Sequence, residues 1–396
     1  MRRLVVSLGL TVVLATPASG QALRLMTRDL AKVQAMARED SNDAEIHYYL
    51  ALAFWQRHKW EQVDSALRLA IRLDPRFSEA YLALYYLPYV RRPSLAKEED
   101  RGAVGEAWRP VLEEAHRFYQ RAFRINPLVD LRLYSVIYEI EEPRINDFTS
   151  SEYLEYERYV AWLVDFGLSR YASAYDRLKR LAAREFSESK HPDKVPDFLL
   201  WYRGLAAAHS RQYDAAMADI QTLLDRTLKK QERDEVVHVP MRDNEYRFML
   251  AALNHVTGHA DRAVALYHEA LEHDLGLSMA HTYLAVIYET AGMADSGLVE
   301  RQRAAEAGED DPVALFDYAA ALFNAQRTAE AEEPLRRAAA LNPRYAPTYY
   351  LLGRVDEELG RVPEARTAYT QFLAVASQRL GDLIADARQH LATLPQ

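Results

Sequence analysis

The sequence lacks cysteine altogether and has little glycine, with 14 glycines in 396 residues. The absence of cysteine excludes disulfide bonds, zinc-thiolate sites, cysteine catalysis and a lipid-modified N-terminal cysteine. The scarcity of glycine argues against a turn-rich all-β fold. The formal net charge of −9 argues against non-specific binding to nucleic acid. With 49% hydrophobic and 27% charged residues, the chain has the balance of an ordinary folded protein, which excludes wholesale disorder.

A mostly apolar run lies near the start of the chain. Arg2 and Arg3 precede this run, which extends from Leu4 to Ala15, and a small, turn-prone segment from Thr16 to Ala22 follows it. The three parts together are typical of a secretory signal peptide, and the run is shorter than the ~20 residues of a membrane-spanning helix. No later stretch is apolar enough to span a membrane. We therefore predict a signal peptide over residues 1–22 and an exported mature protein, periplasmic or secreted, that is not inserted in a membrane.

A pattern of small and aromatic residues repeats in the C-terminal part of the chain. Ala331 and Leu335 are four residues apart, and Ala365 and Tyr369 repeat this spacing 34 residues later. Apolar residues recur at i, i+3, i+4 and i+7 on both sides of a turn signal at Gly360, which predicts two amphipathic helices in each unit. Proline disfavours a helix at the preceding residue, so each proline-containing stop separates two helices. These stops are Leu73–Pro75, Ile125–Pro127 and Leu341–Pro343.

These residues resemble the tetratricopeptide repeat family. Its 34-residue unit carries Leu-Gly or Leu-Ala and an aromatic residue in the first helix, and alanines, an aromatic residue or leucine and a closing proline in the second. The pattern is clearest where Leu352 and Gly353 lie in the first helix of a unit and Ala365 and Tyr369 in the second. Matching units are Ala44–Phe77, Asn244–Leu277, Ser278–Asp311, Pro312–Tyr345 and Ala346–Arg379.

The middle of the chain departs from this pattern. Ser78–Tyr89 and Trp108–Ile125 are predicted to form one helix pair, separated by a polar insertion at residues 91–107. Glu139–Arg184 is predicted to hold further amphipathic helices, and Leu200–Asp225 returns to the repeat pattern. Loops at Ser187–Pro196 and Arg233–Pro240, with end helices at Leu23–Asp40 and Gln378–Leu394, complete an array of about eight helix pairs.

The resemblance implies an all-α fold, a right-handed α-α superhelix whose concave groove is lined mainly by the first helix of each pair. One pair cannot bury its own apolar faces, so stacked pairs share a continuous core. We divide the chain into a signal peptide (residues 1–22), an N-terminal repeat region (23–130), an irregular helical middle (131–240) and a C-terminal array with a capping helix (241–396).

The resemblance also implies which side chains face the groove: the second, fifth, ninth and twelfth residues of each first helix. The lysine, asparagine and arginine residues that clamp a terminal carboxylate in some repeats are missing from these places. Aromatic residues fill many of them, and tyrosine and tryptophan provide rigid contact area with a polar tip. Core packing between repeats is the alternative use of these aromatic residues, and both interpretations stay open. The predicted partner-binding residues are Tyr48, Trp55, Tyr86, Tyr89, Trp201, Phe248, Phe316 and Tyr350.

Few residues have the spacing of a catalytic or metal site. His255 and His259 are four apart, but Gly258 falls at the turn of its unit, so the two histidines are expected on different elements. His268 and His273 are five apart, which does not place them on one helix face. The sequence contains neither a phosphate-binding glycine loop nor a nucleophile elbow. We predict no catalytic residue, no bound metal and no cofactor.

The sequence therefore predicts a non-catalytic scaffold of the cell envelope or secreted fraction that binds a peptide or partner protein in its groove. The alternative is an α-helical toroid that acts on or binds glycans, with an acid pair between Glu139 and Asp165. The 34-residue period argues against the toroid, because such toroids do not keep it.

Overall fold

The computed structural model describes residues 26–91, 101–131, 133–138, 149, 151, 155–156, 160–233, 242–308 and 310–395, without the side chains of 101–107. Within these residues the regular elements are all helices, and no strand occurs. The predicted signal peptide at residues 1–22 lies outside them. Across the described ranges, no helix combines the length and apolar character that crossing a bilayer requires.

Consecutive helices pack against each other in pairs. The N-terminal pairs are α3 (Ala44–Trp55) with α4 (Trp60–Leu73), α5 (Ser78–Arg91) with α6 (Arg101–Ile125), α9 (Ala161–Gly167) with α10 (Tyr171–Glu185), and α11 (Asp197–His209) with α12 (Tyr213–Glu232). The C-terminal pairs are α13 (Asp243–Val256) with α14 (Ala260–His273), α15 (Ser278–Thr290) with α16 (Ala294–Ala307), α17 (Pro312–Asn324) with α18 (Thr328–Leu341), and α19 (Ala346–Glu358) with α20 (Val362–Val375). Single helices outside the pairs are α2 (Leu30–Glu39), α7 (Tyr134–Ile137) and α21 (Gly381–Thr393).

The five units predicted from the 34-residue pattern coincide with helix pairs. Four of their first helices begin at the predicted residue, and α13 begins one residue before it, at Asp243. The predicted end helices are present in shorter form, as α2 and as α21, which follows a 3₁₀ turn at Gln378–Leu380. Local periodicity was therefore sufficient to predict these elements.

The predicted insertion at residues 91–107 is partly helical, which corrects its description as a polar connection. Arg91 is the last residue of α5, and α6 begins at Arg101 rather than at Trp108. Gly102 and Gly105 weaken a helix by only about 1 kcal/mol each relative to alanine, and no proline lies between Arg101 and Trp108. Residues 92–100 lie outside the described ranges. The predicted loop at Ser187–Pro196 contains one 3₁₀ turn, Pro192–Lys194, whereas residues 234–240 of the other predicted loop are not described.

A left-handed residue closes the turn inside most pairs. In seven pairs of the described chain, the residue two positions before the second helix has a positive φ. Glycine adopts this conformation freely, whereas another residue there costs roughly 1 kcal/mol because its Cβ crowds the backbone. These residues are His58, Ser169, Arg211, Gly258, Gly292, Gln326 and Gly360, with φ between 54° and 81°.

Small residues let neighbouring helices approach closely. Ala338 and Ala365 are fully buried, as the repeat phase predicts. A Cβ atom on Gly353 would lie 2.7 Å from the ring of Tyr369, so α19 and α20 meet there without room for a side chain. The largest core cluster runs from the first pair to Ile287 in α15, which is the continuous core that stacked pairs produce.

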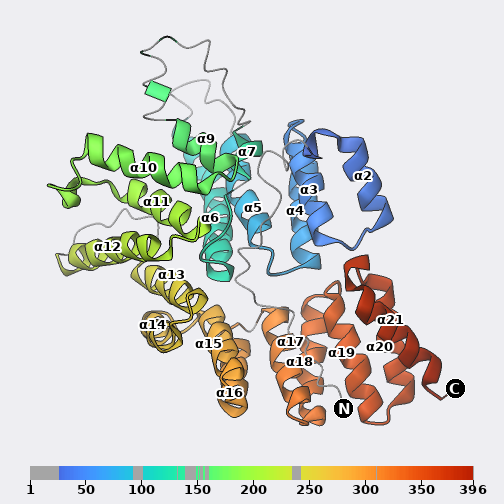
Figure 1. The fold of residues 1–396 in the computed structure, drawn as a ribbon. Coiled ribbons are helices and arrows are strands. Elements are labelled where there is room, and N and C mark those ends of the chain that lie inside the picture. The colour runs from blue at the N-terminus through green and yellow to red at the C-terminus, as the bar shows by residue number, and fades with distance from the viewer. Residues whose placement is uncertain are drawn as a thin grey trace.

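The array of pairs follows a curve that returns toward its own beginning. Figure 1 shows the helices passing from α2–α4 through α10–α12 and α13–α16, so that α17–α21 lie beside the first helices. Side-chain hydrogen bonds join these distant segments, including the following two. Ser377 Oγ donates to the Asp40 carboxylate at 2.8 Å, and Asn342 Nδ2 donates to the backbone carbonyl of Arg72 at 2.7 Å. We call this contact between the N-terminal loops and the C-terminal units the seam.

Candidate functional site

Six of the eight predicted partner-binding residues are buried in the core, each with at most 5% of its surface exposed. The first helix of a pair packs against its partner and against neighbouring pairs, so large rings on it fill the space between helices. The Trp201 ring, for example, lies 5.6 Å from the ring of Phe123 and 6.3 Å from that of Tyr246. In this structure these rings belong to the core and do not form a groove surface. The six are Tyr48, Trp55, Trp201, Phe248, Phe316 and Tyr350.

The other two predicted residues, Tyr86 and Tyr89, lie on α5 within a cluster of tyrosines. The Tyr86 hydroxyl is 2.7 Å from the Tyr134 hydroxyl, and burial holds the pKa of Tyr86 well above its usual value. Tyr89 packs edge-on against Tyr85 and is about half exposed, at 48%. Of the eight residues, Tyr89 is therefore the most accessible to a partner.

Tyr350 belongs to a polar network that attaches the C-terminal helix. Its hydroxyl donates to Asp386 in α21 at 2.5 Å. In the same network, His390 of α21 has Nδ1 2.7 Å from a Glu357 oxygen, and the Tyr369 hydroxyl donates to Glu357 at 2.8 Å. This network spans α19, α20 and α21, so it explains how the predicted capping helix is held.

The other sites considered from the sequence have structural roles. His255 is in α13 and His259 is the N-cap of α14, which confirms that they lie on different elements. Asp165, at the end of the segment considered for a glycan-acting acid pair, is buried and accepts a hydrogen bond from Arg177 Nε at 2.7 Å. Glu139 lies outside the described residues. The described residues contain no group of three or more histidine, aspartate or glutamate side chains placed to hold a metal ion.

The seam carries a row of ion pairs between residues far apart in sequence. Arg76 Nη1 lies 2.8 Å from an Asp317 oxygen, across 241 residues of sequence. Two further pairs are Arg121 with Asp311, at 2.9 Å, and Arg124 with Asp274, at 2.7 Å. Each of these three pairs joins a basic residue of α6 or of the loop between α4 and α5 to an acidic residue in the C-terminal units.

Five of the loops that precede first helices or follow second helices share one local structure. In each of the five, an aspartate or asparagine oxygen accepts a hydrogen bond from the backbone N–H two residues on, at 2.9–3.1 Å, which makes an Asx turn. In three of the five loops the second polar atom of that side chain bonds across the seam: Asp40 to Ser377, Asp274 to Arg124 and Asn342 to Arg72. The residues of the remaining two loops are Asp74 and Asn126.

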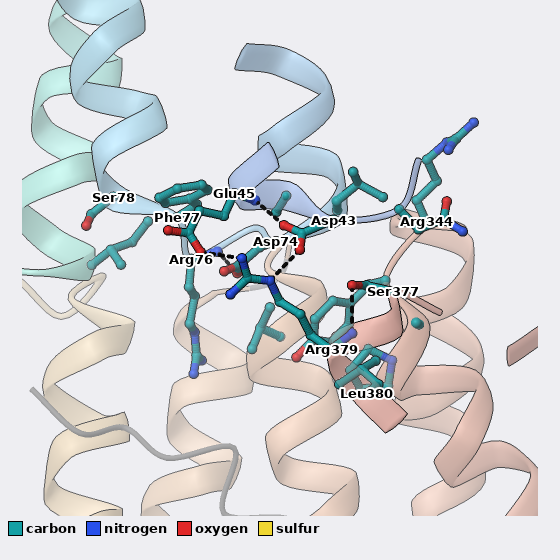
Figure 2. Close-up of a pocket in the computed structure, with 18 of the residues that line it drawn as sticks. Asp43, Glu45, Asp74, Arg76, Phe77, Ser78, Arg344, Ser377, Arg379 and Leu380 are labelled. Atoms are coloured by element: carbon teal, nitrogen blue, oxygen red, sulfur yellow. Dashed lines mark hydrogen bonds and ion pairs between the residues drawn. The ribbon is translucent and has the colours of Figure 1, made fainter. Parts of the chain in front are cut away.

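A cavity of about 620 Å³ opens at the seam, and both Asp74 and Asn126 line it. The first turns of α3, α5, α15, α17 and α19 all contribute to its wall. Figure 2 shows the loop that carries Asp74 and Arg76 facing the segment that carries Ser377 and Arg379. Loops and helix ends from both halves of the chain therefore build one concave site.

The charges of the cavity are unevenly paired. Arg379 Nε donates to Asp43, and Arg379 Nη2 lies 2.6 Å from Glu45, so its guanidinium bridges these two acids (Figure 2). Arg76 is paired with Asp317. Asp74 forms no ion pair with any described residue, and burial raises the pKa of its carboxyl group, opposed by the nearby Arg76 charge.

Sequence reasoning missed this site, although one signal was present. The stops at Leu73–Pro75 and Ile125–Pro127 were interpreted only as helix boundaries, and their Asp74 and Asn126 side chains were not considered as cavity residues. Asx turns are recognisable from sequence, but the meeting of loops more than 200 residues apart depends on the curvature of the whole array.

No protein-family model matches the chain, and no curated protein matches its sequence. Solved structures match it at low similarity. The C-terminal part of a TPR repeat-containing protein from Cytophaga hutchinsonii has 15% identity and a TM-score of 0.45, covering 60% of this chain and 86% of that one. MamA from MSR-1 has 18% identity and a TM-score of 0.33, covering 48% and 98%. A double mutant of MamA from RS-1 has 14% identity and a TM-score of 0.37, covering 47% and 96%.

These likenesses concern the fold alone. The helix pairs of this chain, their 34-residue period and their shared turn conformation define an all-α array of the tetratricopeptide type.

Proposed function

We propose that this protein is an exported, non-catalytic scaffold that binds a segment of a partner protein on the concave side of its helix array. The observation that carries the proposal is the seam cavity, a concave site of about 620 Å³ built by loops from both halves of an array of helix pairs. Such arrays present extended concave surfaces, and binding residues concentrate on loops held by a rigid scaffold.

The pairing of buried acids in the described residues supports a binding role over a catalytic one. The buried acids Asp165, Asp219 and Asp311 each face an arginine partner, as expected of residues that hold helices together. The glycan-acting alternative has one supporting observation, the closed curve of the array, and the described part of its candidate segment offers two acids, the exposed Glu155 and the ion-paired Asp165.

A crosslinking experiment tests the scaffold function. A photo-reactive residue at Tyr89 and another at Arg344, both exposed, are introduced separately into the full-length protein in the native cell. We expect a discrete crosslinked protein species from at least one position, and none from a control at the outer, exposed residue Asp261. Equal crosslinking patterns at all three positions, or none at any, would refute a specific binding surface.

Export is proposed from residues 1–22 alone, through their charged start, apolar run and small-residue segment. N-terminal sequencing of the protein from an extracytoplasmic fraction should find a start near Gln21 or Leu23. An intact Met1 on the protein of the soluble cytoplasmic fraction would contradict export.

A further inference from the structure

Several polar groups of the seam cavity have no hydrogen-bond partner among the residues that the structure describes; Arg76 Nε and Nη2 are two of these atoms, and three other groups bear on a ligand. Asp74 uses one carboxylate oxygen to accept the Arg76 backbone N–H, and its other oxygen makes no hydrogen bond. Asn126 likewise uses only its carbonyl oxygen, to accept the Leu128 backbone N–H, which leaves its amide nitrogen unbonded. The third group is the hydroxyl of Tyr345.

Tyr345 is the most informative of the three, because its side chain is more than nine-tenths buried, at 8% exposed. Its hydroxyl makes no hydrogen bond. The hydroxyl oxygen is not fully enclosed by protein atoms, and Tyr345 lines the cavity, so the hydroxyl reaches the open space of the cavity. A buried phenol normally finds a hydrogen-bond partner, since an unsatisfied one costs roughly 1–3 kcal/mol. A group that enters the cavity would supply the missing partner.

The charge in the cavity indicates which kind of group would enter. Four acids line it, Asp43, Glu45, Asp74 and Asp317, against Arg76, Arg344 and Arg379. In Figure 2, the Arg344 side chain points away from the other labelled residues. Arg76 is paired with Asp317, and Arg379 with Asp43 and Glu45, so Asp74 remains a carboxylate that forms no ion pair with a described residue, although the Arg76 charge is near it.

The protein itself shows how the cavity receives a cation. The guanidinium of Arg379 enters from the segment after α20 and bridges Asp43 and Glu45 at one side of the cavity. The Asp74 carboxylate can pair with a cation in the same way, but no described arginine or lysine of the protein forms an ion pair with it. Its raised pKa reflects the cost of burying a carboxylate, and a cation beside it would offset that cost.

We propose that the seam cavity binds an arginine or lysine side chain within an extended segment of the partner protein. This inference rests on the proposed scaffold function and specifies its site and ligand chemistry. The cationic group pairs with Asp74, while the Asn126 amide nitrogen and the Tyr345 hydroxyl bond to main-chain carbonyls of the segment. The volume of about 620 Å³ lies within the range of ligand pockets, roughly 300–1,000 Å³.

Calorimetric titration of the full-length mature chain tests the inference with defined probes. The probes are a blocked pentapeptide with arginine at its centre, the same peptide with uncharged citrulline there, and free arginine. We expect the arginine peptide to bind at least tenfold more tightly than either other probe. Equal affinity for the citrulline peptide would overturn the cation site, and equal affinity for free arginine would overturn the requirement for an extended segment.

Two variants and a control connect the binding to the named groups. Asp74→Asn keeps the turn, because the corresponding turns at Asn126 and Asn342 use asparagine, but removes the charge; we expect at least a tenfold loss of affinity for the arginine peptide. Tyr345→Phe removes only the unbonded hydroxyl, and we expect a severalfold loss at an unchanged melting temperature. Glu333→Gln makes the same charge change on the exposed face of α18 and should leave affinity unchanged.

The outcomes separate this inference from the proposed function. If Asp74→Asn and Tyr345→Phe both bind the arginine peptide as the wild type does, the cavity is not the site. If these variants also crosslink the cellular partner normally, the inference fails while the scaffold function stands. Absence of any partner in the wild type would instead refute the scaffold function.

Discussion

The ion pair between Arg121 and Asp311 offers a direct test of whether the seam stabilises the fold. Asp311 caps α17, with one oxygen accepting the Val313 backbone N–H at 3.0 Å, and its other oxygen lies 2.9 Å from Arg121 Nη2. Its side chain is 3% exposed. Asp311→Asn keeps a good N-cap but removes the charge, so it isolates the seam contribution from the helix cap.

The expected loss in the free energy of unfolding lies between the values for fully buried and fully exposed ion pairs. Removing one partner of a buried pair costs about 3–5 kcal/mol, whereas exposed pairs contribute about 0.2–1 kcal/mol. Because Arg121 keeps about a third of its side chain in water, at 32% exposed, we expect Asp311→Asn to lower the free energy of unfolding by about 1–3 kcal/mol. Asp311→Ala should cost about 1 kcal/mol more, since it also removes the cap.

Urea denaturation measures the stability, and hydrogen exchange locates the change. In an open array each repeat contacts only its neighbours, so damage would stay within α16 to α18. With a closed seam, exchange should also rise in α6, which carries Arg121 about 190 residues away in sequence. Asp261→Asn, an exposed acid in the first turn of α14, is the matched control and should change neither measurement.

Two results would refute this reasoning. If Asp311→Asn unfolds at the same urea concentration as the wild type, the seam pair contributes nothing measurable. If the variant is destabilised but exchange rises only in α16 to α18, the seam does not couple the two halves of the chain.

Gly353→Ala should destabilise the protein by about 1–3 kcal/mol, measured by urea denaturation, because its Cβ would overlap the Tyr369 ring; an unchanged midpoint would mean that the helices separate freely. Ala338→Trp should cost about as much by overpacking, and a wild-type melting curve would contradict the assigned repeat phase. Gln326→Gly should stabilise by about 0.5–1 kcal/mol by relieving a positive φ, and a lower melting temperature would be evidence against that conformation. Burial raises the pKa of the Asp311 carboxyl group, but the Arg76 and Arg121 charges outweigh this effect, so the pKa lies below its ordinary value of 3.8. The stability that ionised Asp311 provides is therefore full above pH 4 and declines as the pH falls further. In thermal melts recorded from pH 7 to 3, the stability difference between wild type and Asp311→Asn should shrink below pH 4.

Local spacing along the sequence determined the helix pairs. The recurrence of Ala331 and Leu335 at Ala365 and Tyr369 predicted four helices whose bounds the structure reproduces within a few residues. This succeeds because helix periodicity, proline stops and turn glycines such as Gly360 act over a few residues. The same reasoning failed at residues 101–107, which the polar composition of residues 91–107 assigned to an insertion between two helices although α6 runs through them.

Only the tertiary structure decided which surfaces are free. A helical pattern shows that Tyr48 and Phe316 lie on an apolar face of their helices. Such a face can line a groove or pack against a neighbouring helix pair, and the pattern does not distinguish the two. The structure buries Tyr48 and Phe316. Likewise, Asp74 and Tyr345 meet in one cavity because small rotations between successive pairs add up until the array returns on itself. That sum is a property of all the packing interfaces together, so no local stretch of sequence contains it.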